Sequence, residues 1–254
     1  MSAQVLPHEV HGNGEHHVVA LHGWFGDRRA FSSIWPYLDE HRFSYAFLDC
    51  RGYGEAIDTK GEYTIDEVAG DTLATADELG WQDFSLIGHS MGGKAAQAVL
   101  ARSPERVRKL VGVSPVPASG VPFDEQSGQL FSAAPDDPGS RRAIIDFTTG
   151  NRLTGTWLDV MVRGSTECSD VEAFRGYLDS WAVEDFHERI AGGKTPMMVI
   201  AGEHDPALGE QAMRGTFGTW YPSAEIRVMP NAGHYSPDET PLALITLIEE
   251  FLAE

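Results

Sequence analysis

Short apolar runs alternate with longer amphipathic stretches along most of the chain. Residues 18–21, 110–113 and 197–201 are apolar at successive positions, which is typical of strands covered on both faces. We predict buried strands within 16–24, 43–54, 84–90, 107–115, 195–205 and 224–234. An antiparallel edge strand is expected near 4–12, where Pro7 is tolerated.

Helical patterns occupy the intervals between these strands. They cover residues 64–79, 91–102, 207–220 and 240–253. In the last stretch, Thr240 and Pro241 form a helix start signal. Strands that alternate with helices predict an α/β fold with a mostly parallel, doubly wound sheet.

The segment 115–194 breaks this rhythm because it contains no convincing buried strand. It opens with a Pro-, Gly- and Ser-rich stretch, 114–128, that we interpret as a loop. Helical patterns follow at 140–149, 154–163 and 169–182, with large apolar side chains. We therefore predict a core domain made of 1–114 and 195–254, with a helical cap (lid) inserted at 115–194.

Composition narrows the class of protein. The 254 residues carry a formal net charge of -19, which disfavours binding to nucleic acid or anionic lipid. We find no secretory signal pattern and no apolar run long enough to span a membrane. Cys50 and Cys168 lie far apart, so we expect unpaired thiols. Together these features predict a cytoplasmic protein whose oligomeric state the sequence leaves open.

The stretch "GHSMGG" places Ser90 between glycines, where a predicted strand meets a predicted helix. Glycines two positions before and after the serine permit a tight turn, and the helix start directs free N–H groups to the same spot. A structural turn serine is the alternative. The strand and helix around the motif favour a nucleophile.

A serine hydroxyl needs a base, and the base needs an orienting carboxylate. His234 follows a predicted strand and leads into the last helix, which places it at the same edge of the sheet as Ser90. Asp205 follows another strand at that edge. The loop near Ser114 offers no carboxylate before Asp124, so Asp205 is the predicted acid. His89 is expected to support the turn, and Glu203 and Asp238 to be solvated.

An oxyanion hole needs two backbone donors. Met91, at the helix start, supplies one. The turn at His22-Gly23 directs the N–H of Trp24 toward the same edge and supplies the other.

The motifs "HGWFGD", "DCRGYGEA", "GHSMGGKA", "GEHD" and "NAGHYSPDE" occur in this order. In order and spacing the chain resembles the alpha/beta-hydrolase superfamily, over its whole length apart from the insertion, which corresponds to the family's cap. The resemblance implies Ser90 as nucleophile, Asp205 as acid and His234 as base, with oxyanion amides from Trp24 and Met91. Asp49 and Arg51 match a turn that is usually structural.

These observations predict a serine esterase, of the carboxylesterase type, that needs no cofactor or metal. Its substrate would be a small apolar carboxylic ester, with a lactone or thioester as variants. Members resembling haloalkane dehalogenases and epoxide hydrolases carry aspartate at the position of Ser90, which disfavours those activities. Large cap side chains predict a pocket lined by Phe147, Trp157, Met161 and Trp181.

Two alternatives stay open at this stage. The same triad serves carbon–carbon bond hydrolases, lyases, synthases and perhydrolases. A non-catalytic ligand receptor on this fold is a further alternative.

Overall fold

The computed structural model describes residues 2–222 and 224–254, and within them the strands form one seven-stranded sheet. The strand order is β1-β3-β2-β4-β5-β6-β7, and every neighbouring pair is parallel except β1 with β3. The strands are β1 (His8–Gly12), β2 (His16–Leu21), β3 (Phe43–Leu48), β4 (Phe84–His89), β5 (Val107–Val113), β6 (Met197–Gly202) and β7 (Glu225–Met229). The predicted fold class and the antiparallel edge strand are confirmed.

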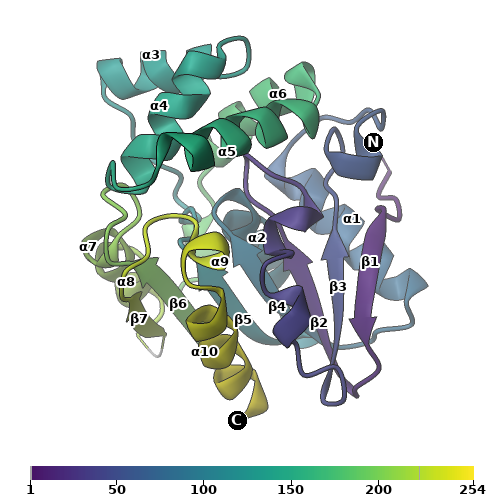
Figure 1. Ribbon diagram of the computed structural model, residues 1–254. Coiled ribbons are helices and arrows are strands. Elements are labelled where there is room, and N and C mark those ends of the chain that lie inside the picture. Colours follow the sequence, from purple (N-terminus) through teal and green to yellow (C-terminus); the bar gives the residue numbers. More distant parts are fainter. Residues whose placement is uncertain (1, 223) are drawn as a thin grey trace.

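Two apolar layers cover the sheet because successive strand residues point to opposite faces. In β2, Val19 and Leu21 pack into the same cluster as α1 (Ile65–Glu78) and α2 (Met91–Arg102). Val18 and Ala20 face the other way, into the cluster that contains Leu244 and Ile248 of α10 (Pro241–Ala253). In Figure 1, α10 lies on the side of the sheet opposite α1 and α2.

Four helices lie together beyond the carboxyl ends of the strands (Figure 1): α3 (Glu125–Ala133), α4 (Pro138–Thr148), α5 (Gly155–Glu167) and α6 (Val171–Val183). The interpretation of 114–128 as a loop was wrong at its end. Asp124 accepts a hydrogen bond from the N–H of Ser127 and starts α3. The Pro and Gly content of the stretch hid this N-cap.

Side chains of α2 and of the loop after β2 hold α6, one of these four helices. Lys94 of α2 donates from Nζ to the carbonyl oxygen of Trp181 at 2.9 Å and to that of Glu184, at the end of α6. The Trp24 indole donates to the Phe174 carbonyl at 2.7 Å and stacks on the Phe174 ring at 3.9 Å between centroids. α6 is therefore held against the core by specific contacts as well as by apolar packing.

The C-terminal part departs from prediction at two further places. The predicted helix 207–220 is divided at Thr216 into α7 (Glu210–Gly215) and α8 (Phe217–Trp220). Gly215 and the non-helical backbone of Thr216 mark the break. A short helix, α9 (Ser236–Glu239), precedes α10 and was not predicted.

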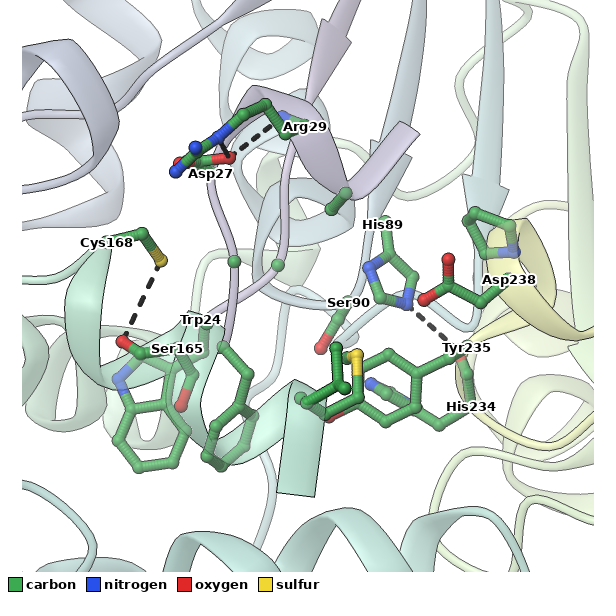
Figure 2. Close-up of a pocket in the computed structure, with 18 of the residues that line it drawn as sticks. Trp24, Asp27, Arg29, His89, Ser90, Ser165, Cys168, His234, Tyr235 and Asp238 are labelled. Carbon is green, nitrogen blue, oxygen red and sulfur yellow. Dashed lines mark hydrogen bonds and ion pairs between the residues drawn. The ribbon is translucent and has the colours of Figure 1, made fainter. Parts of the chain in front are cut away.

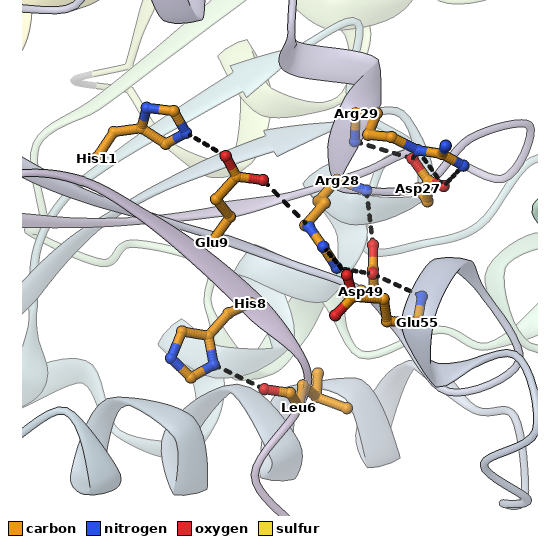
Figure 3. A network of polar contacts seen from close by, with 9 residues as sticks. All are labelled: Leu6, His8, Glu9, His11, Asp27, Arg28, Arg29, Asp49 and Glu55. Carbon is orange, nitrogen blue, oxygen red and sulfur yellow. Dashed lines mark hydrogen bonds and ion pairs between the residues drawn. The ribbon is translucent and has the colours of Figure 1, made fainter.

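The turn after β3 is held by charge, as the sequence indicated for Asp49 and Arg51. Asp49 accepts hydrogen bonds from the N–H groups of Arg28 and Glu55, each at 2.9 Å, and pairs with the Arg28 guanidinium (Figure 3). Arg51 pairs with Asp71 at 2.6 Å and with Glu67 at 2.9 Å. Asp49 thus fixes the turn to the segment that follows β2, and Arg51 fixes it to α1.

Candidate active site

Ser90 is the single residue between β4 and α2. Its φ of 53° and ψ of -117° lie in a region that costs a residue with a side chain about 1–3 kcal/mol. Three backbone hydrogen bonds hold it there. The Ser90 N–H donates to Val113 at 3.0 Å, and the Ser90 carbonyl accepts from Gly93 and Val116 at 2.9 Å each.

The glycines around Ser90 are required by space. A Cβ on Gly88 would lie 2.4 Å from the carbonyl oxygen of Gly92. A Cβ on Gly92 would lie 2.2 Å from the carbonyl oxygen of Leu21 in β2. Both distances are far shorter than van der Waals contact, so a larger residue at either position would require the backbone to shift. The turn therefore packs tightly while the Ser90 side chain stays at the cavity wall.

His234 and Asp205 meet as the chain order predicted. His234 lies between β7 and α9, and its Nδ1 donates to Asp205 Oδ2 at 2.7 Å. Asp205 is buried, and its Oδ1 accepts from the N–H groups of Ala207 and Leu208 at 2.9 Å each. Since Nδ1 carries the proton, the neutral ring keeps a lone pair on Nε2.

Ser90 and His234 line the same cavities, and within the described residues no hydrogen bond joins them. Hydrogen bonds between a nucleophile and its base are often long before substrate binds. Figure 2 shows both side chains at the cavity wall, with His89 and Tyr235 beside them.

His89 supports the backbone of His234. Its Nε2 donates to the His234 carbonyl at 2.8 Å, and its ring is buried. Burial lowers the pKa of His89 to about 3, with the nearby His234 ring adding to the effect. His89 therefore stays neutral near pH 7 and acts as a fixed donor.

The turn after β2 is aligned by His22. Its Nδ1 donates to the Gly23 carbonyl at 2.8 Å, and its Nε2 accepts from the Cys50 N–H at 3.1 Å. The carbonyl of Gly23 and the N–H of Trp24 share one peptide plane and point in opposite directions. His22 therefore turns the Trp24 N–H away from itself.

This turn lies directly against the nucleophile position. A Cβ on Gly23 would come within 3.2 Å of Ser90 Cβ. The backbone N–H of Trp24 has no acceptor among the described residues, although Trp24 is buried. Met91 opens α2, so its N–H has no intrahelical acceptor. The backbone N–H groups of Trp24 and Met91 therefore both lack an acceptor among the described residues, and both belong to segments that lie against Ser90.

Two cavities meet at Ser90. Both are lined by Trp24, Phe25, Ser90, His234 and Tyr235. One, of about 340 Å³, runs toward the end of α5 and includes charged side chains. The other, of about 270 Å³, has no Asp, Glu, Lys or Arg in its lining. We call them the polar branch and the apolar branch.

The predicted pocket residues are divided between these branches. Phe147 and Trp181 line the apolar branch, and Met161 lines the polar branch. Trp157 lines neither. Its ring lies edge-on against Tyr235, 5.6 Å between centroids, and so packs behind a lining residue.

The sequence interpretation missed several lining residues. Phe25 and Tyr235 each follow a residue that was predicted, and that adjacency could have identified them. Phe123 lies in the segment interpreted as a loop, with Phe131 directly beyond it, and both line the apolar branch. Asp238 was expected to be solvated; it is exposed, and it also lines the polar branch.

Across residues 2–222 and 224–254, no helix has the length and apolar character needed to cross a bilayer. The same residues hold no group of three or more His, Cys, Asp or Glu side chains placed to bind a metal ion. Both cysteines are buried and unpaired.

Comparison with known proteins gives a consistent family. A family model described as alpha/beta hydrolase fold matches residues 16–156. A Haemophilus influenzae protein with the provisional name esterase/lipase is 33% identical over 243 residues, covering 92% of this chain and 82% of its own. A pimeloyl-[acyl-carrier protein] methyl ester esterase of Yersinia enterocolitica is 25% identical and covers 94% of each chain.

Solved structures agree on the fold. An esterase from Exiguobacterium antarcticum superposes with a TM-score of 0.87 at 17% identity and covers 100% of both chains.

Proposed function

The chain belongs to the alpha/beta hydrolase family, and from that premise we propose that it is a serine hydrolase that cleaves carboxylic esters. The observation that carries this proposal is the Asp205–His234 hydrogen bond of 2.7 Å at a cavity that Ser90 also lines. Similarity to proteins named as esterases supports the ester as the substrate class.

The proposed reaction begins with proton transfer. His234 Nε2 takes the proton of the Ser90 hydroxyl as its oxygen attacks the ester carbonyl carbon. Asp205 stays ionised and stabilises the imidazolium that forms. The N–H groups of Trp24 and Met91 donate to the developing oxyanion.

Breakdown of this intermediate releases the alcohol. His234 gives its proton to the leaving oxygen, and an acyl ester remains on Ser90. Water then takes the place of the alcohol, loses a proton to His234 and attacks the acyl carbon. The acid leaves, and the Ser90 hydroxyl is restored.

The strained backbone of Ser90 has a role in this scheme. Fixed by three backbone hydrogen bonds, the serine needs little rearrangement to reach the carbonyl carbon. The surrounding fold holds Ser90 in this conformation, so the free-energy cost of the strain is incurred on folding and not on substrate binding.

The test is turnover of p-nitrophenyl butyrate by Ser90→Ala. Loss of the nucleophile should lower kcat by about 10³-fold or more, with the melting temperature preserved. Ser85→Ala is the matched control because Ser85 lies in the same strand, away from the cavity, where its hydroxyl bonds His16. Turnover by Ser90→Ala equal to that of Ser85→Ala would refute the proposal.

A further inference from the structure

The two branches that meet at Ser90 differ in charge. The apolar branch is lined by side chains such as Val121, Phe123, Phe131 and Leu208, and none of its lining residues is ionised except when His234 is protonated. The polar branch carries Asp27, Arg29, Glu167 and Asp238. A substrate with two arms on its carbonyl carbon therefore meets two different environments.

The positive charge in the polar branch is already neutralised. Arg29 donates from Nε to Asp27 Oδ2 at 2.9 Å and from Nη2 to the same carboxylate. His89, which also lines this branch, is neutral because burial lowers its pKa to about 3. Arg29 is thus committed to Asp27.

The negative charge is not neutralised. Glu167 forms no ion pair with any described residue, and it lies at the end of α5, where the helix dipole is also negative. Asp238 accepts a hydrogen bond from the uncharged hydroxyl of Ser33 at 3.0 Å. Figure 2 shows Asp238 on the side of the cavity where His89 lies. Two uncompensated carboxylates therefore flank the route to Ser90.

The order of the reaction indicates which arm enters this branch. Once the alcohol has left, water must occupy its position beside His234 while the acyl group stays on Ser90. Water is better held beside the carboxylates of the polar branch than among the phenylalanine and leucine side chains of the apolar branch. The alcohol arm thus fits the polar branch, and the alkyl acyl chain fits the apolar branch.

Building on the proposed ester hydrolysis, we propose that Glu167 and Asp238 make the enzyme selective for the charge of the alcohol arm. Esters of cationic alcohols are preferred, neutral ones follow, and esters of anionic alcohols are rejected. Each carboxylate near the leaving group changes kcat/KM by about twofold per unit charge at low ionic strength.

Three butyrate esters of similar shape test this inference. Their alcohol arms are choline (cationic), 3,3-dimethylbutanol (neutral) and 3-hydroxypropane-1-sulfonate (anionic). Desolvation raises the pKa of Asp238, so kcat/KM is measured at pH 8, where its carboxylate is ionised. We expect the choline ester to be fastest and the sulfonate ester slowest, with the spread reduced by 0.5 M NaCl.

The double variant Glu167→Gln, Asp238→Asn should compress the ratio between the cationic and anionic esters by about 16-fold, because each of two carboxylates acts over two units of charge. Asp83→Asn is the matched control, because it removes one negative charge just before β4, far from the carboxyl ends of the strands. It should leave all three ratios unchanged. Equal rates for the three esters, an unaltered ratio in the double variant, or an equal change in Asp83→Asn would each overturn the inference.

A separate readout distinguishes this inference from the proposed function. If the protein hydrolyses none of the esters, the proposed function fails. Calorimetric titration of the Ser90→Ala variant with the same three compounds then measures charge preference by binding alone. The same order of affinity supports charge selection by Glu167 and Asp238, whereas equal affinities or no binding would contradict it.

Discussion

At the scale of single residues, the site depends on histidines whose tautomers are fixed by their neighbours. His22, His89 and His234 each donate one ring N–H to a carbonyl or carboxylate. Each therefore has a defined donor and a defined acceptor nitrogen. Of the three, only His234 bonds to a carboxylate, that of Asp205, as the proposed reaction requires of its base.

His89 gives a prediction about pH. Burial lowers its pKa to about 3, while in the unfolded chain it titrates near its ordinary value of 6.5. Below that ordinary value the unfolded state binds a proton that the folded state does not. Stability conferred by the neutral ring is therefore complete above pH 6.5 and is lost as pH falls toward 3, by about 1.4 kcal/mol per pH unit.

The measurement is urea unfolding of the native chain and of His89→Gln between pH 7 and pH 5. Glutamine keeps a donor at the position of Nε2 but does not titrate. The native chain should lose about 2 kcal/mol more than the variant over this range. An equal change in the free energy of unfolding with pH in the two proteins would contradict a buried neutral His89.

The sequence carried much of this residue-scale information. Ser90, Asp205 and His234 were predicted from their places after strands, and the structure brings all three to one edge of the sheet. The sequence did not reveal the indole of Trp24 bonding to the Phe174 carbonyl, because that contact joins residues 150 positions apart. It also missed Asp238 in the cavity wall, since a short unpredicted helix positions it.

At the scale of elements, the junction of β4, α2 and β2 determines where Ser90 stands. Gly92 packs its Cα against the carbonyl of Leu21, so the helix approaches the neighbouring strand at backbone distance. Periodicity predicted α2 at its observed bounds. It could not predict this approach, which depends on how the elements pack.

Two glycine variants test the packing. Gly92→Ala places a Cβ 2.2 Å from backbone and should destabilise the fold by about 2 kcal/mol or more and lower esterase activity. Gly164→Ala, in the last turn of α5, meets nothing within 4 Å and should stabilise by about 0.5–1 kcal/mol. Thermal or urea unfolding compares them. Stability changes of equal size and sign would show that the close approach is not the constraint.

The helices α3–α6 show where element prediction was weakest. Large apolar residues correctly indicated helices near α4, α5 and α6, but the Pro- and Gly-containing start concealed α3. Asp124 supplies the N-cap that overrides this composition locally. Both cavities depend on these helices, so their shapes lay beyond sequence reasoning.

At the scale of the whole molecule, residues from the two ends and the middle of the chain form one site. The parallel sheet accounts for this, because the loops after β2, β4, β6 and β7 all emerge at its carboxyl edge. The helices α3–α6 cover that edge and divide the space above Ser90 into two branches. Division of the chain into a core (1–114 and 195–254) and a cap (115–194) stays a proposal.

The covalent intermediate provides the most direct test of the central claim, that Ser90 attacks an acyl carbon. The protein is mixed briefly with p-nitrophenyl butyrate, quenched in acid, digested and analysed by mass spectrometry. The account predicts a butyryl group on the peptide that contains Ser90, and none in Ser90→Ala. Hydrolysis of the ester with the acyl group on another residue, or with no acylated peptide at all, would contradict it.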